Sequence, residues 1–200
     1  MPTENVDLML LQGNIEADPK FNHFREAGMN YVPGSGTEMY PPIMFIGEGP
    51  GPVENKTKTV LSGRSGKIFN EALKITGYTR DQVYMTNVLK YMSTDEKGRS
   101  KKPAPFEIED FSKYVADEIL SVSPIIVCVM GTSALSAIFP NETSVSKVRG
   151  KLLEDKMGNR YLVTYPPSYF EYPDNKKYSY ILETDFGKLA HYARKFSGNK

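Results

Sequence analysis

The chain has 200 residues, a formal net charge of +1, an apolar fraction of 40% and one cysteine. These values argue against a disordered chain, and no apolar run approaches the roughly 18 residues that cross a membrane. A chain of this length buries roughly 70% of its unfolded surface, so it needs no disulfide or metal to hold a core. We therefore expect one soluble domain over residues 1–200. We place it in the cytoplasm, because its first residues lack the pattern of a signal peptide.

Short apolar runs alternate along the chain with segments of helical periodicity. Strands are predicted over residues 43–46, 83–89, 125–130 and 161–165. Helices are predicted over residues 66–76, 107–122, 133–139 and 184–196, and Gly77 stands at the C-cap position of the first. This alternation is typical of a parallel sheet that is covered on both faces. The predicted fold is α/β, with three α/β/α layers around a mostly parallel four-stranded sheet.

Three of the predicted strands end in loops that carry polar or glycine-rich motifs. The first loop reads Gly47-Glu48-Gly49-Pro50-Gly51, and Glu54 follows it. Its glycines let the backbone approach a ligand closely, and a carboxylate at a strand end can orient or activate water. The alternative is a structural turn with a solvated glutamate.

The other two loops follow the second and fourth predicted strands. Asn87 carries an amide with a donor and an acceptor, which suits the edge of uracil better than that of cytosine; the alternative is a cap of the strand exit. In the third loop two prolines precede Ser168, which could meet a phosphate, or the loop is simply a rigid turn. Because the carboxyl ends of parallel strands share one edge of a sheet, we expect the three loops to converge.

The single cysteine and the basic residues say less about function than the three loops do. Cys128 lies in an apolar run and is expected to be a buried small hydrophobe, and we expect no metal, since no Cys/His cluster has ligand spacing. Two groups of cations are candidate DNA contacts or solvated loops. They are Lys97, Arg99, Lys101 and Lys102, and then Lys147, Arg149 and Lys151.

Taken together, the motifs resemble those of the family 4 uracil-DNA glycosylases. Residues 47–55 with Gly63-Arg64-Ser65-Gly66 resemble the first motif of that family, and Thr86-Asn87-Val88-Leu89-Lys90 resembles the next. Arg149-Gly150, Thr164-Tyr165 and Pro167-Ser168 resemble the carboxyl-terminal motif. The likeness runs from about residue 25 to residue 169 and beyond, with three motifs in the same order.

The resemblance implies an enzyme that flips uracil, or a related damaged pyrimidine, out of DNA and hydrolyses its N-glycosidic bond. It implies that Glu48 and Asn87 are the catalytic residues, with Glu48 positioning water and Asn87 reading the base. It also implies that Glu54 walls off the methyl group of thymine. Further base-pocket residues would be Gly47, Gly49, Pro50, Gly51 and Leu61. Further DNA contacts would be Ser65, Lys90, Arg149, Pro167 and Ser168. The implied partners are uracil-containing DNA, single- or double-stranded, and a replication or repair protein, without a membrane.

Three positions depart from the family pattern. Pro166 stands where the family has a histidine, and it offers neither a side-chain donor nor a backbone N–H; one lost donor costs about two to three orders of magnitude in rate. Leu61 replaces a phenylalanine that stacks on the base, a contact worth roughly 1–3 kcal/mol. Tyr91 replaces a cysteine of the iron–sulfur cluster that many members hold on four cysteines, so no cofactor is expected. These departures leave two alternatives open, a catalytically silent DNA-binding or protein-interaction module and a changed base preference.

Overall fold

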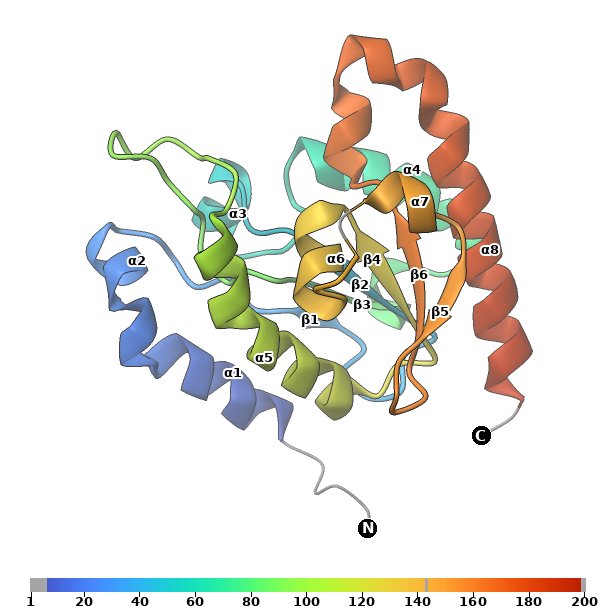
Figure 1. Ribbon diagram of the computed structural model, residues 1–200, viewed down its shortest axis with the longest axis horizontal. Helices are drawn as coiled ribbons and strands as arrows, with labels where there is room; N and C mark the ends of the chain where they lie inside the picture. Colours follow the sequence, from blue (N-terminus) through green and yellow to red (C-terminus); the bar gives the residue numbers. More distant parts are fainter. Residues whose placement is uncertain (1–6, 143, 199–200) are drawn as a thin grey trace.

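One sheet of six strands lies at the centre of the computed structural model, which describes residues 7–142 and 144–198 (Figure 1). The strands are β1 (Ser35–Gly36), β2 (Ile43–Gly47), β3 (Tyr84–Asn87), β4 (Ile126–Met130), β5 (Leu152–Glu154) and β6 (Arg160–Thr164). Their order across the sheet is β1-β3-β2-β4-β6-β5. The neighbours among β3, β2, β4 and β6 are parallel, so the predicted four-stranded parallel core is confirmed. The two antiparallel edge strands were not predicted, because two or three residues show no period.

The helices predicted from periodicity are also present. The α-helices are α1 (Leu8–Ala17), α2 (Asn22–Glu26), α3 (Pro52–Thr57), α4 (Arg64–Thr76), α5 (Pro105–Val122), α6 (Thr132–Ile138), α7 (Val145–Val148) and α8 (Ser179–Ser197). Short 3-10 helices are η1 (Pro19–Phe21), η2 (Arg80–Gln82), η3 (Pro167–Glu171) and η4 (Pro173–Tyr178). Gly77 closes α4 with a left-handed φ of 78°, as its C-cap position predicted. Within the described chain, every helix is too short or too polar to cross a bilayer.

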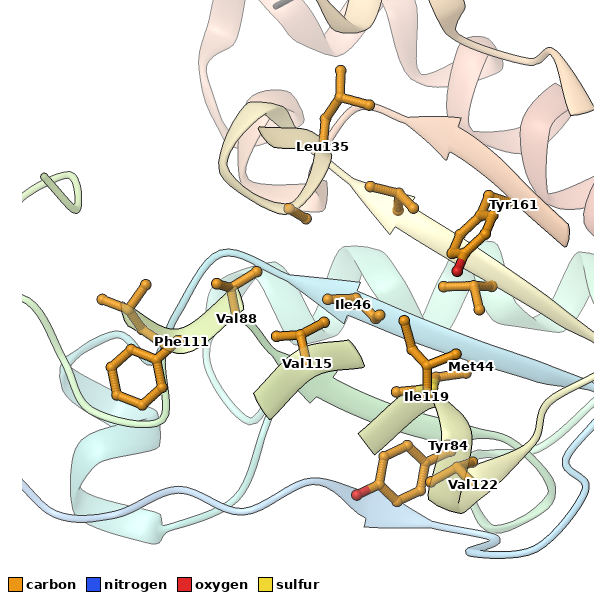
Figure 2. Packing of buried hydrophobic residues seen from close by; sticks show 14 of the residues in the cluster. Met44, Ile46, Tyr84, Val88, Phe111, Val115, Ile119, Val122, Leu135 and Tyr161 are labelled. Carbon is orange, nitrogen blue, oxygen red and sulfur yellow. The ribbon is translucent and has the colours of Figure 1, made fainter. Parts of the chain in front are cut away.

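The sheet separates two hydrophobic clusters, one on each face. Met44 and Ile46 point to the cluster formed with α1, α5 and α6, and Figure 2 shows them opposite Val115 and Ile119 of α5. The alternate residue Phe45 points to the other cluster, formed with α4 and α8. This alternation follows from the two-residue period of a strand, and it confirms the three-layer α/β/α prediction.

The second strand of the core is shorter than predicted. The sequence predicted a strand over residues 83–89, but β3 ends at Asn87. Val88 and Leu89 then donate backbone hydrogen bonds to the carbonyls of Gly47 and Glu48, at 2.9 and 3.0 Å. Their apolar side chains are buried without belonging to a strand, which explains why the apolar run overstated its length.

The strand order reverses between β2 and β4. The chain passes from β2 to β3 on one side, and later adds β4 on the other side of β2. In open parallel sheets such a reversal leaves a crevice beyond the carboxyl ends of the two strands, which is where ligands usually bind. Residues that follow β2 and β4 therefore stand at the place where the fold favours a site.

Candidate functional site

A cleft of about 230 Å³ opens beyond the carboxyl ends of the parallel strands. Residues of all three predicted loops line it: Gly47, Glu48, Gly49, Pro50, Gly51, Asn87, Leu89, Pro166, Pro167 and Ser168. Glu54, Leu61, Ser65 and Lys101 line it as well. The structure thus brings the three loops together, as expected from the parallel arrangement.

Asn87 lies at the end of β3, directly opposite Gly47 of β2. Its side chain is only slightly exposed (6%) and still faces the cleft. A Cβ atom on Gly47 would lie 2.5 Å from the Asn87 amide oxygen. A larger residue at position 47 would therefore displace the amide, so this glycine is required by the approach of the asparagine side chain.

The Lys90 side chain is buried, which contradicts its predicted role as a DNA contact. The side chain is fully buried, and its Nζ donates to the carbonyl oxygen of Asn87 at 2.8 Å and to Glu118 Oε2 at 2.6 Å. Both partners of this ion pair are about 1% exposed. The chain turns after β3, which carries the lysine inward to Glu118 of α5, and burying a charge requires such a partner.

Glu118 is the centre of a buried polar network that was not predicted from the sequence. Its carboxylate also accepts hydrogen bonds from the Tyr84 hydroxyl at 2.7 Å and from Thr86 Oγ1 at 3.1 Å. Burial, together with the nearby carboxylate, raises the pKa of Tyr84 above its ordinary value, so the tyrosine stays protonated and donates. The sequence did contain an indication of this network, because Glu118 falls on the inward face of the predicted helix, three residues after Val115.

Glu54 stabilises the first loop through hydrogen bonds from two backbone N–H groups. Its Oε1 accepts from the Gly63 N–H at 2.7 Å and its Oε2 from the Gly51 N–H at 3.2 Å. A Cβ atom on either glycine would lie 2.9 Å from the carboxylate. Both oxygens of Glu54 are thus engaged by the backbone, and the residue holds the two ends of the segment together at the cleft wall.

Glu48 lies in the same cleft but is held differently. Its Oε2 accepts a hydrogen bond of 2.5 Å from the hydroxyl of Ser133. Ser133 belongs to the first turn of α6, directly after β4, and is 2% exposed. Ser133 was not predicted as a site residue, because the predicted motifs lie in the loops after β2, β3 and β6. Hydroxyl residues immediately after the apolar run over residues 125–130 were the signal that could have found it.

The predicted DNA contacts are spread over different environments. Ser168 is exposed at the cleft, while Pro167 lines it but is buried. The Ser65 hydroxyl donates to Glu171 at 2.6 Å. Arg149 lies outside the lining of the cleft, and its guanidinium forms an ion pair of 2.9 Å with the buried Asp185, which leaves the side chain 29% exposed. The cleft itself therefore brings together only part of the predicted set.

Pro166 and Leu61, two of the three positions that depart from the family pattern, both lie at the cleft. Pro166 lines the cleft, and its ring lies 3.2 Å from the position of a Cβ atom on Gly131, so the two residues are in close contact. Leu61 also lines the cleft and adopts a left-handed φ of 53°. Both positions are therefore occupied by apolar side chains at the site.

The residues present do not fit a cysteine-bound iron–sulfur cluster. Tyr91, at the expected ligand position, is buried and stacks on Phe24 with ring centroids 5.3 Å apart. Burial raises the pKa of the Cys128 thiol well above its ordinary value, and the chain has no second cysteine. Across residues 7–142 and 144–198, no group of three or more metal-binding side chains is assembled. Stacked aromatic rings pack the region around Tyr91 instead.

Comparison with known proteins identifies the family. The model of the uracil DNA glycosylase superfamily matches residues 33–184, and the chain belongs to this superfamily. The chain is 32% identical to a type-4 uracil-DNA glycosylase of Archaeoglobus fulgidus over 80% of both proteins. It is 34% identical to that of Sulfurisphaera tokodaii, over 82% of this chain and 75% of the relative. It is 33% identical to that of Saccharolobus solfataricus, over 93% of this chain and 85% of the relative. The resemblance seen in the sequence motifs is confirmed.

Proposed function

We propose that this protein is a DNA glycosylase that flips uracil out of DNA and hydrolyses its N-glycosidic bond. The observation that carries the proposal is the cleft at the strand reversal, which holds Glu48 and Asn87 on adjacent strand ends. Membership of the uracil DNA glycosylase superfamily supports the same reaction. In that reaction the bond between the sugar C1′ and the base N1 breaks, a water oxygen adds to C1′, and the released base takes up a proton.

The two side chains have complementary roles in this proposal. The Glu48 carboxylate orients the attacking water and stabilises the positive charge that develops on the sugar. The Asn87 amide, for which the absence of a side chain at Gly47 leaves room, pairs with the uracil edge. Glu54 contributes by holding the loop that forms the pocket wall, and Leu61 gives the base an apolar contact. Gly49, Pro50 and Gly51 form the rest of that wall.

DNA is the proposed partner. Ser65, Pro167 and Ser168 line the cleft where a flipped nucleotide would enter. Arg149 lies outside that lining, and its side chain is 29% exposed. Lys101 also lines the cleft, and its charge favours the phosphates. We further propose one domain over residues 1–200, because the described strands form a single sheet, a cytoplasmic location, and a replication or repair protein as a second partner.

The proposal is tested by incubating the purified protein with single- and double-stranded oligonucleotides that contain one uracil, and with matched thymine oligonucleotides. We expect abasic sites in the uracil strands only. Glu48→Gln is expected to lower the rate by about 10²–10³-fold, the range for loss of one preorganised electrostatic group, and Asn87→Ala is expected to lower it while relaxing selection of the base.

Three other results of this assay would each lead to a different conclusion. Intact oligonucleotides that bind the protein in a salt-dependent manner would identify a silent DNA-binding module and overturn the proposal. Cleavage of 5-hydroxymethyluracil or hypoxanthine but not uracil would reveal a changed base preference. Cleavage of uracil that survives both substitutions would leave the activity standing and overturn the assignment of the two residues.

A further inference from the structure

The hydrogen bond between Ser133 and Glu48 spans the strand reversal. Glu48 follows β2, and Ser133 follows β4, its neighbour across the crevice. A serine near a helix end commonly bonds to backbone groups close to it in the chain. Ser133 instead donates to a carboxylate 85 residues away in the chain, at 2.5 Å. The direction of this hydroxyl is therefore set by the site rather than by its own helix.

Glu48 has space on two sides. It lines the cleft of about 230 Å³ and also a second cavity of about 290 Å³. The two share Met130, Pro166 and Ser168 as lining residues. Glutamate is a flexible side chain, and holding it in one rotamer costs conformational entropy. A specific restraint is thus needed to keep the carboxylate in one orientation.

Ser133 can supply that restraint because the turn before it is tightly fixed. Gly131 adopts a left-handed φ of 93°, and its N–H donates to the carbonyl of Thr164 on β6 at 2.9 Å. The ring of Pro166 packs against the same glycine. The residue that replaces the family histidine therefore supports the turn from which Ser133 reaches Glu48.

We propose that Ser133 is a positioning residue for Glu48, and that Pro166 stabilises the turn that presents it. By holding Oε2, the serine hydroxyl leaves Oε1 for water; among the described residues, no protein group donates to that second oxygen. This inference rests on the proposed glycosylase function, because it gives the restraint a catalytic purpose.

The test compares Ser133→Ala, Ser133→Thr and a matched control, Ser136→Ala. Ser136 lies one turn further along α6, and its hydroxyl bonds back to the Ser133 carbonyl rather than to Glu48. For Ser133→Ala we expect kcat on uracil DNA to fall about 10-fold or more, since a hydrogen bond to a charged group contributes about 1.5–3 kcal/mol, with the DNA Kd unchanged. Ser133→Thr, which keeps the hydroxyl, and Ser136→Ala are expected to stay close to the original rate.

A double variant separates positioning from a general structural effect. If Ser133 acts through Glu48, adding Ser133→Ala to Glu48→Gln lowers the rate no further. An equal loss in both backgrounds, or a loss shared by Ser136→Ala, would overturn the inference. Should the original protein cleave no uracil DNA, the proposed function fails by itself. Crystal structures of the original protein and of Ser133→Ala then decide the positioning: one Glu48 conformer in both overturns it, and a second conformer only in the variant supports it.

Discussion

Glu48 and Asn87 stand side by side at the ends of β2 and β3, yet the fold holds them in opposite ways. The backbone of Asn87 is held from the protein interior, because its carbonyl accepts a hydrogen bond from Lys90. That lysine forms a buried ion pair with Glu118. The side chain of Glu48 is held in the cleft by one neutral hydroxyl, that of Ser133. A charged, solvent-free network thus supports one residue, and a single hydrogen bond supports the other.

The difference suits the roles proposed for the two residues. A group that reads a base needs a fixed place, and a buried, fully bonded network gives rigidity in a low-dielectric interior. A carboxylate that works on water must keep its charge and its access to solvent, so it cannot be enclosed in the same way. The two supports can be broken separately, and the sizes of the effects should differ accordingly.

The largest effect is expected from Lys90→Met, which removes the cation from the Asn87 side. Glu118 would remain buried without its partner, and breaking a buried ion pair by removing one member costs about 3–5 kcal/mol. The free energy of unfolding, measured by urea denaturation, should fall by that amount. Lys101→Met, at an exposed lysine of the cleft, is the control and should change stability by less than about 0.5 kcal/mol. Equal stability of the two variants would show that the Lys90–Glu118 pair is not the anchor inferred here.

An intermediate effect is expected from Tyr84→Phe, which removes one donor from Glu118 and leaves the ion pair intact. Loss of a hydrogen bond to a charged group should lower the free energy of unfolding by about 1.5–3 kcal/mol. Tyr172→Phe, at a tyrosine that is 66% exposed, is the matched control. A loss as large as that of Lys90→Met would mean that the hydroxyl, rather than the lysine, carries the network.

Tyr84 should also make the stability of the protein depend on pH. Burial and Glu118 raise the folded-state pKa of Tyr84. Its contribution to the free energy of unfolding is therefore complete below the pKa of tyrosine in the unfolded chain, about 10. It is lost as the pH rises above that value, because the unfolded chain then releases the proton and the folded chain does not. The fall in stability in alkaline solution should therefore be smaller in Tyr84→Phe than in the original protein.

The parallel core and its helices could be predicted from the sequence, and so could most of the cleft. Apolar runs such as residues 43–46 and the periodicity of residues 107–122 are long enough to be recognised, and parallel strands bring their carboxyl ends together. Lys90 was misread because a motif locates a residue along the chain but does not tell which way its side chain points. Ser133 was missed for a similar reason, since its partner is distant in sequence and only the order of β2 and β4 makes them neighbours.

The smallest effect is expected from Pro166→His, which adds a second polar group to the weakly held Glu48 side. An imidazole there could donate to the departing base, a type of contact worth about 10²–10³-fold when it is preorganised. In this chain the gain should be smaller, on the order of tenfold, because the new side chain also gives up the packing of the proline ring on Gly131. The measurement is kcat on single-stranded uracil DNA, with Pro103→His, elsewhere on the cleft lining, as the control. A stable Pro166→His protein that is slower than the original would show that support of the Gly131 turn, and through it of Ser133, outweighs the missing donor.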